Sequence, residues 1–268
     1  MKRKLFTFLM AFLATVGNAV WGQTPIDLSS QDANITSTGN YTITGDGGSS
    51  HTIAVNTSGD VHITVNNASA NQNGGDNNAF SIESGTVYLT LEGTNSFISG
   101  HEHAGIYVAE GATLIIDGEG SLTAECAKTN GYSSSLAAGI GGSSDNPNFG
   151  TIWIKGGNIT ARSYSDGQNS GTSTHAHGAG IGGGNNSSNG TIIITGGAVN
   201  AACEDLDGLY TSGYYAAVGA GIGGGYQGTC DAIAILGGTV TAYNTVSYGG
   251  NTGNNIGTGY DYSGSKHP

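Results

Sequence analysis

The 268-residue sequence has little proline and few residues that carry positive charge. Proline occurs three times, and lysine and arginine together seven times, against 19 aspartate and glutamate residues, which gives a formal net charge of −12. An acidic surface repels phosphate backbones and anionic lipid headgroups. The composition therefore argues against nucleic acid as a partner.

Long hydrophobic stretches are also missing, apart from one run at the N-terminus. Three basic residues, Lys2–Lys4, precede the apolar run Leu5–Val16, and small residues follow up to Gly22. This order is typical of a secretory signal peptide, and the run is too short to span a bilayer. The alternative, a buried N-terminal helix, finds no other helical pattern to pack against. We expect residues 1–22 to be removed on export, leaving a protein that is secreted, periplasmic or on the cell surface.

Glycine is abundant, at 49 residues, and much of it falls in a repeated motif. Ala-Gly-Ile-Gly-Gly, a polar turn, and a stretch of the type Thr-Ile-x-Ile-x-Gly-Gly-x-Val-x-Ala recur at Ala138–Ala161, Ala179–Ala201 and Ala220–Ala242. Weaker copies extend the repeat in both directions. Aligning all copies gives the equivalent isoleucines Ile53, Ile82, Ile106, Ile140, Ile181, Ile222 and Ile256.

The repeat has the pattern of a β-solenoid coil. Alternation such as Thr191–Thr195 predicts a short strand with one buried face, and the Gly-Gly and Asn/Ser-rich clusters predict bends. One coil cannot bury its apolar face alone, so successive coils must stack. We therefore predict an all-β parallel β-helix of about six to seven coils. Ile154, Ile194 and Ile235 should share one internal column.

The spacing of the repeats predicts the shape of the coil. The shortest interval, from Ile82 to Ile106, is 24 residues, which suits three strands and three bends. Longer repeats carry insertions after the final alanine, at Arg162–His177 and Ala202–Val218, and these should lie on one edge of the solenoid. We predict an N-terminal cap at residues 23–58, the β-helix at 59–257 and a flexible tail at 258–268.

The three cysteines of an exported chain cannot all pair. Cys126 and Cys203 occupy equivalent places two repeats apart, which corresponds to about 9.6 Å in a stack. This distance is too long for a disulfide. We expect three small, mostly buried thiols, with a Cys203–Cys230 bridge through a loop as the alternative.

Tyrosines gather in the long insertions at the predicted loop edge. Their rings present flat apolar faces with a hydroxyl at the rim, which complements the C–H faces and hydroxyls of sugars. The alternative is that the tyrosines only anchor the loops. The candidate carbohydrate-binding residues are Tyr164, Tyr210, Tyr214, Tyr215 and Tyr243.

Two groups of side chains at the same edge are candidate metal ligands. Glu204, Asp205 and Asp207 have the oxygen density that Ca²⁺ prefers, although no EF-hand pattern is present. The alternative is that these carboxylates keep a glycine-rich surface soluble. The histidine pairs His101/His103 and His175/His177 lack a third ligand nearby, so we interpret them as a solvated polar edge.

The Ala179–Ala201 repeat resembles that of secreted bacterial surface proteins with right-handed β-helix domains, many of them described as carbohydrate-binding domain-containing proteins of pectate-lyase-like fold. The resemblance covers roughly residues 80–257. It implies a right-handed solenoid and a polysaccharide or surface glycan as partner. Because the repeated residues are those that build coils, it is more specific for architecture than for function.

The same resemblance raises the question of catalysis. Pectate lyases use Ca²⁺ and an arginine base, and Arg162 is the only arginine outside the predicted signal peptide. An enzyme would need Asp166, Asp205 or Asp207 to converge with Arg162 or His177. We expect instead a monomeric, non-catalytic carbohydrate-binding or adhesion protein. The alternatives are a structural or protein-adhesive solenoid and, less favoured, a polysaccharide lyase or glycoside hydrolase.

Overall fold

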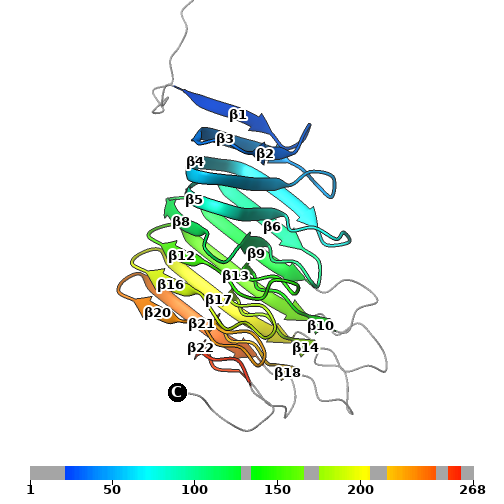
Figure 1. Ribbon diagram of the computed structural model, residues 1–268, viewed down its shortest axis with the longest axis vertical. Coiled ribbons are helices and arrows are strands. Elements are labelled where there is room, and N and C mark those ends of the chain that lie inside the picture. The colour runs from blue at the N-terminus through cyan, green and yellow to red at the C-terminus, as the bar shows by residue number, and fades with distance from the viewer. Residues whose placement is uncertain (1–21, 128–133, 166–174, 206–215, 246–252, 261–268) are drawn as a thin grey trace, which may run out of the picture.

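The computed structural model describes residues 22–127, 134–165, 175–205, 216–245 and 253–260. Within these ranges the chain consists of β-strands and turns, and every strand pairing is parallel. The strands wind into a right-handed parallel β-helix, as predicted from the repeats (Figure 1). No helix long and apolar enough to cross a membrane occurs in the described ranges.

Each coil contributes one strand to each of three faces. The first face contains β2 (Ala33–Ile35), the start of β4 (Ile53–Gln72) and of β5 (Phe80–Glu92), β7 (Ile106–Val108), β11 (Ile140–Gly141), β15 (Ile181–Gly182), β19 (Ile222–Gly223) and β22 (Ile256–Gly257). The second contains β1 (Gln23–Asp27), β3 (Gly39–Asp46), the following parts of β4 and β5, β8 (Thr113–Gly118), β12 (Thr151–Ile154), β16 (Thr191–Ile194) and β20 (Ala232–Ile235). The third contains the end of β4, β6 (Thr94–Ser99), β9 (Ser121–Ala127), β13 (Asn158–Ser165), β17 (Ala198–Asp205) and β21 (Thr239–Thr245).

A small second sheet closes the side where the third-face strands end. It consists of β10 (Ser134–Ser135), β14 (His175–Ala176) and β18 (Ala216–Ala217). The ends of β9, β13 and β17 precede the segments that lie outside the described residues. The predicted insertions begin too early, because their first residues, 162–165 and 202–205, still belong to β13 and β17 and pair with neighbouring coils.

Inward-facing side chains form continuous columns through the stack. Ile140 pairs with Ile106 on one side and with Ile181 on the other, and the column continues through the following coils. Ile154, Ile194 and Ile235 form the second predicted column. The second column agrees with the repeat alignment, the first agrees at all but one position, and the members of both before the last coil are fully buried.

One position of the predicted first column is wrong. Phe80, and not Ile82, pairs with Ile106 and with Ile53, whereas Ile82 pairs with Val108 and Val55. Both Phe80 and Ile82 are buried. Because side chains alternate along a strand, an error of two residues leaves the same side chains inward and does not disturb the pattern.

Parallel pairing begins within the segment expected to form the cap. β1 pairs with β3, and β3 pairs with β4. Leu28 and Ile43 are completely buried there. Residues 23–58 therefore form coils of the same kind as the rest of the stack.

None of the three cysteines is in a disulfide bond. Cys126 and Cys203 are buried and flank Ser163 in one register column, which separates them by a full coil. Burial raises the pKa of Cys126 to about 12, and burial with the charge of Asp231 raises that of Cys230 to about 11. These thiols are therefore poor nucleophiles at neutral pH.

Candidate functional site

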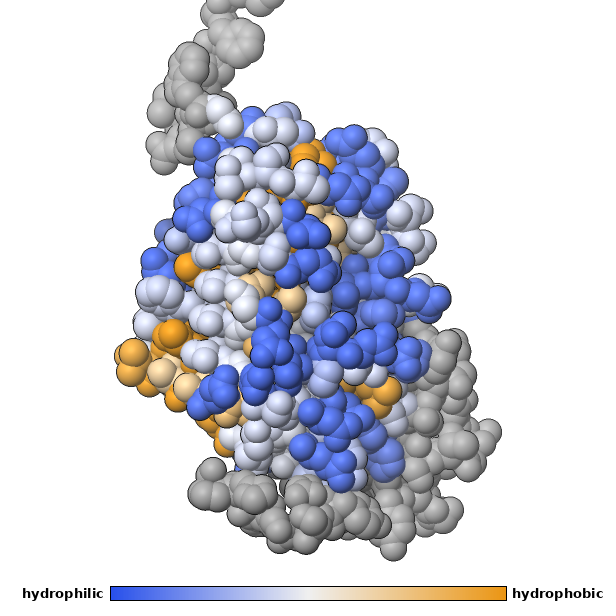
Figure 2. Space-filling model, viewed as in Figure 1, coloured by the Kyte–Doolittle hydropathy of each residue, from blue (hydrophilic) through white to orange (hydrophobic). Residues whose placement is uncertain are grey.

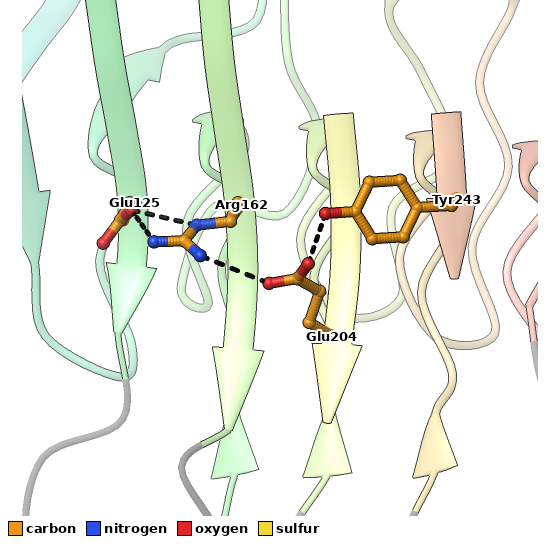
Figure 3. Close-up of polar contacts among 4 residues, drawn as sticks. All are labelled: Glu125, Arg162, Glu204 and Tyr243. Atoms are coloured by element: carbon orange, nitrogen blue, oxygen red, sulfur yellow. Dashed lines mark hydrogen bonds and ion pairs between the residues drawn. The ribbon is translucent and has the colours of Figure 1, made fainter. Parts of the chain in front are cut away.

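A polar network crosses the outer surface of the third face, from β9 to β21 (Figure 3). Arg162 lies directly opposite Glu125 in the register of β13 and β9. Its Nε donates to Glu125 Oε1 at 2.9 Å, its second terminal nitrogen donates to the same oxygen, and Nη1 lies 3.5 Å from Glu204 Oε2. The Tyr243 hydroxyl donates to Glu204 Oε1. We call these four residues the Arg162 network.

The charges of the Arg162 network are largely removed from water. The side chains of Glu125 and Glu204 are 6% and 8% exposed, and that of Arg162 is 31% exposed. Burial by itself would lower the pKa of Arg162, but the bond and charge of Glu125 and the charge of Glu204 outweigh it and raise that pKa. Burial and the bond to Glu204 raise the pKa of Tyr243. The carboxylates of Glu125 and Glu204 are therefore paired with Arg162 inside the network at neutral pH.

The structure brings two of the five predicted carbohydrate-binding tyrosines together. The Arg162 guanidinium lies 5.3 Å from the ring centroid of Tyr164, and Tyr243 bonds to Glu204 as described above. Tyr164 thus contacts the Arg162 network, and Tyr243 is a member of it. Tyr210, Tyr214 and Tyr215 lie outside the described residues.

The predicted calcium ligands are only partly described. Both carboxylate oxygens of Glu204 already have partners, Arg162 and Tyr243. Asp205 is the last residue of β17, and Asp207 lies outside the described ranges. Over the part of the chain that the structure describes, no group of three or more His, Cys, Asp or Glu side chains is placed to hold a metal ion.

His177 directly follows β14 in the chain. Its ring stacks on His175, with centroids 5.4 Å apart, and on Tyr226, with centroids 4.8 Å apart. Burial, and to a lesser extent the charge of His175, lowers the pKa of His177 to about 3. A histidine with this pKa is neutral at physiological pH and packs as an aromatic ring.

A second outer surface was not predicted from the sequence. On the second face, outward positions of adjacent coils are apolar or aromatic and lie directly opposite one another along the stack. We call this column the outer stripe, and it consists of Tyr88, Ile115, Trp153 and Ile193. The four side chains are half-buried, and Figure 2 shows hydrophobic residues at the edge formed by β12, β16 and β20. Alternation could have revealed the stripe, because Ile152 and Ile154 point inward and Trp153 must then point outward.

Neighbouring side chains fix the orientation of the stripe and add hydroxyl groups beside it. Trp153 Nε1 donates to Thr195 Oγ1 of the next coil at 3.0 Å, and Lys155 Nζ lies 5.5 Å from the indole centroid. The ring of Tyr88 stacks on His62, with centroids 4.6 Å apart and planes 13° apart. A threonine column runs parallel to the stripe, two residues earlier in each strand, through Thr86, Thr113, Thr151 and Thr191.

Two grooves of the described surface lie away from the outer stripe. One groove of ≈ 650 Å³ lies over the early coils of the third face, with Asp46, Asn71 and Ile98 among its lining residues. Another of ≈ 600 Å³ follows the bend between the second and third faces, beside Glu92 and Glu119. The outer stripe is thus an open strip on the side of the solenoid.

Comparisons with family models, curated proteins and solved structures found no match for this chain. The resemblance to secreted carbohydrate-binding β-helix proteins stays an expectation. The functional argument therefore depends on the chemistry of the two outer surfaces.

Proposed function

We propose that the protein is an exported, non-catalytic carbohydrate-binding or adhesion β-helix, and that the outer stripe is its main contact surface. The observation that carries this proposal is the register of Tyr88 and Trp153 with the isoleucines between and beyond them. Half-buried aromatic rings can stack on the C–H faces of sugars. The adjacent threonine column provides hydroxyls that can donate to and accept from sugar hydroxyls.

The repetition of the surface favours an extended glycan over a single sugar. Each coil of the outer stripe adds another aromatic or aliphatic side chain about 4.8 Å further along the axis. A polymer that lies along the axis can contact several coils at once, and weak contacts then add through their effective concentration. A long polysaccharide should therefore bind more tightly than a short oligosaccharide of the same composition.

The Arg162 network supports the absence of catalysis. Glycoside hydrolases use two carboxyl groups, of which one must donate a proton and the other must attack or activate water. Glu125 and Glu204 are instead bonded to Arg162 and Tyr243. Such pairing favours a role in holding the coils together. The loop-edge tyrosines are a second candidate surface for the same ligand.

A protein-adhesive role is the second candidate. The observation in its favour is that Ile115 and Ile193 alternate with the aromatic members of the outer stripe. Aliphatic side chains contribute to protein–protein contacts through burial, whereas they add little to sugar stacking. The experiment below separates the two candidates.

The test is binding of the purified protein to a panel of polysaccharides, with and without Ca²⁺, followed by calorimetry on any ligand found. Trp153→Ala and Tyr88→Ala should each weaken binding roughly tenfold, as expected for losing one ring contact. Tyr164→Ala is the matched control on the third face and should bind as the wild type does. If Tyr164→Ala weakened binding while Trp153→Ala and Tyr88→Ala did not, the binding site would lie at the loop edge.

Two further outcomes would overturn the proposal. Silence across the panel in both conditions would favour the protein-adhesive or structural role. Release of shortened or unsaturated products from a polysaccharide would show catalysis.

Dependence of binding on Ca²⁺ would support the predicted calcium site at Glu204, Asp205 and Asp207.

A further inference from the structure

The last coil of the stack differs from the others in charge. Between Ala232 and Tyr260 the sequence has no aspartate, glutamate, lysine or arginine, although the chain carries a formal net charge of −12. This stretch contains β20, β21 and β22, which lie at one end of the solenoid (Figure 1). Each of these strands pairs with a single neighbour among the described residues, namely β16, β17 and β19.

Core positions are open to solvent at this end. Ile235 is 39% exposed and Ile256 is 45% exposed, whereas their register partners Ile194 and Ile222 are completely buried. Leu236, which follows β20, is 76% exposed. Parallel strands with a free edge and apolar side chains are templates for pairing with another chain.

We propose that this end associates with the same end of a second copy of the chain, which gives a two-fold symmetric dimer. The uncharged coil lets two strongly acidic molecules approach without placing like charges opposite one another. The other end of the stack is unsuited to this contact. Its edge strand β1 contains Pro25, which has no N–H to donate, and Asp27, whose side chain is exposed.

The geometry of a three-sided coil is compatible with such a dimer. A two-fold axis through the middle of β21 places β21 antiparallel to its own copy, so that both free edges become paired. The same axis exchanges the first and second faces. It therefore brings β20 opposite the partner's β22, and Ile235 would be covered by the partner's Ile256.

Analytical ultracentrifugation of the purified protein, over a range of concentrations, tests the proposal. The wild type should sediment with twice the mass of one chain. Leu236→Lys and Ile235→Lys place like charges at the interface and should raise the dissociation constant roughly tenfold or more. Thr24→Lys, on the exposed surface of β1 at the opposite end, is the matched control and should remain dimeric.

Circular dichroism distinguishes dissociation from misfolding. We do not expect Leu236→Lys to cause misfolding, because this side chain is already exposed. A wild type that stays monomeric would overturn the proposal, as would a dimer that is insensitive to both variants. Thr241→Cys adds a direct readout of symmetry. A cysteine near the two-fold axis should be linked to its own copy by a short bis-maleimide, while a head-to-tail contact would leave it unlinked.

Discussion

Trp153 is tied to the following coil by the hydrogen bond from its indole Nε1 to Thr195 Oγ1, 3.0 Å long. The two residues are 42 positions apart in the sequence, but Trp153 lies on β12 and Thr195 directly follows β16, the strand that pairs with β12. The bond directs the indole along the stack. A ring held in this way loses little conformational freedom when a ligand stacks on it.

Thr195→Val should therefore weaken ligand binding while leaving the fold intact. The variant removes the acceptor, and the partly exposed indole N–H then bonds to water, so we expect stability to change by no more than about 1 kcal/mol. Ligand affinity should fall by a few-fold, less than in Trp153→Ala. Fluorescence anisotropy of the chain without residues 1–22, where Trp153 is the only tryptophan, should show a more mobile ring. Unchanged anisotropy would show that packing alone orients the indole.

Arg162→Ala should be strongly destabilising, because it leaves two nearly buried carboxylates without their cation. Breaking a buried ion pair from one side costs about 3 kcal/mol or more. Lys155→Ala is the contrasting change, since Lys155 is 44% exposed and lies 3.9 Å from Asp117. We expect it to cost less than about 1 kcal/mol. Urea denaturation of both variants measures the difference.

A second substitution tests the reason for this loss. In the Arg162→Ala background, Glu204→Gln removes one of the two unpaired charges and should recover part of the lost stability. If Glu204→Gln destabilised the protein equally in both backgrounds, the two side chains would be energetically independent. The Arg162 network would then be a result of packing only.

In the four later coils, the glycine after the column isoleucine is required by the close stacking of coils. Gly182 has a φ of 136°, and a Cβ at this position would lie 1.9 Å from the carbonyl oxygen of Gly223. Gly182→Ala should therefore cost about 2 kcal/mol or more. Gly74 has no atom within 4 Å of an added Cβ, so Gly74→Ala should change stability by less than about 0.5 kcal/mol. Equal costs in thermal denaturation would contradict this account of the repeated glycine.

The architecture could be predicted from the sequence because it follows from local rules repeated many times. The alternation of apolar and polar residues predicts inward columns such as that of Ile154 and Ile194, and the Gly-Gly pairs predict the bends between strands. The assignment of Ile82 failed where the repeat is weakest. Only the pairing of Phe80 with Ile106 in the neighbouring coil resolves which inward residue belongs to the column.

The candidate site was less predictable, since it depends on contacts between coils, one of them direct, from Arg162 to Glu125, and one diagonal, from Arg162 to Glu204. Arg162 is 37 residues from Glu125 and 42 from Glu204, and insertions of different length separate the three strands. The sequence suggested acidic loops at this edge, but the pairing of Arg162 with Glu125 and Glu204 can be recognised only when the register of the strands is known. Trp153 was recognisable as outward-facing, but its alignment with Tyr88 also becomes clear only when the coils are stacked.

The stability of the protein should decrease as the pH is lowered from about 7 towards 5, and His177 should be one cause. An unfolded histidine has its ordinary pKa near 6.5, whereas burial, with the charge of His175, lowers the pKa of His177 in the folded protein to about 3. Between these values the unfolded chain binds a proton that the folded chain excludes. Folding is then increasingly disfavoured as the pH falls through this window, and the effect is absent above it.

His177→Gln removes this linkage and should flatten the pH dependence of the unfolding free energy between pH 7 and 5. Asp27 and Asp46, whose pKa values are lowered by bonds to Ser29 and Ser69, act at lower pH and do not interfere in this range. His101, whose pKa is also lowered by burial, should contribute in the same direction and accounts for the residual slope. His62→Gln, at an exposed ring, is the matched control. A slope that is equally steep in His177→Gln and in the wild type would show that the ring of His177 takes up its proton without unfolding.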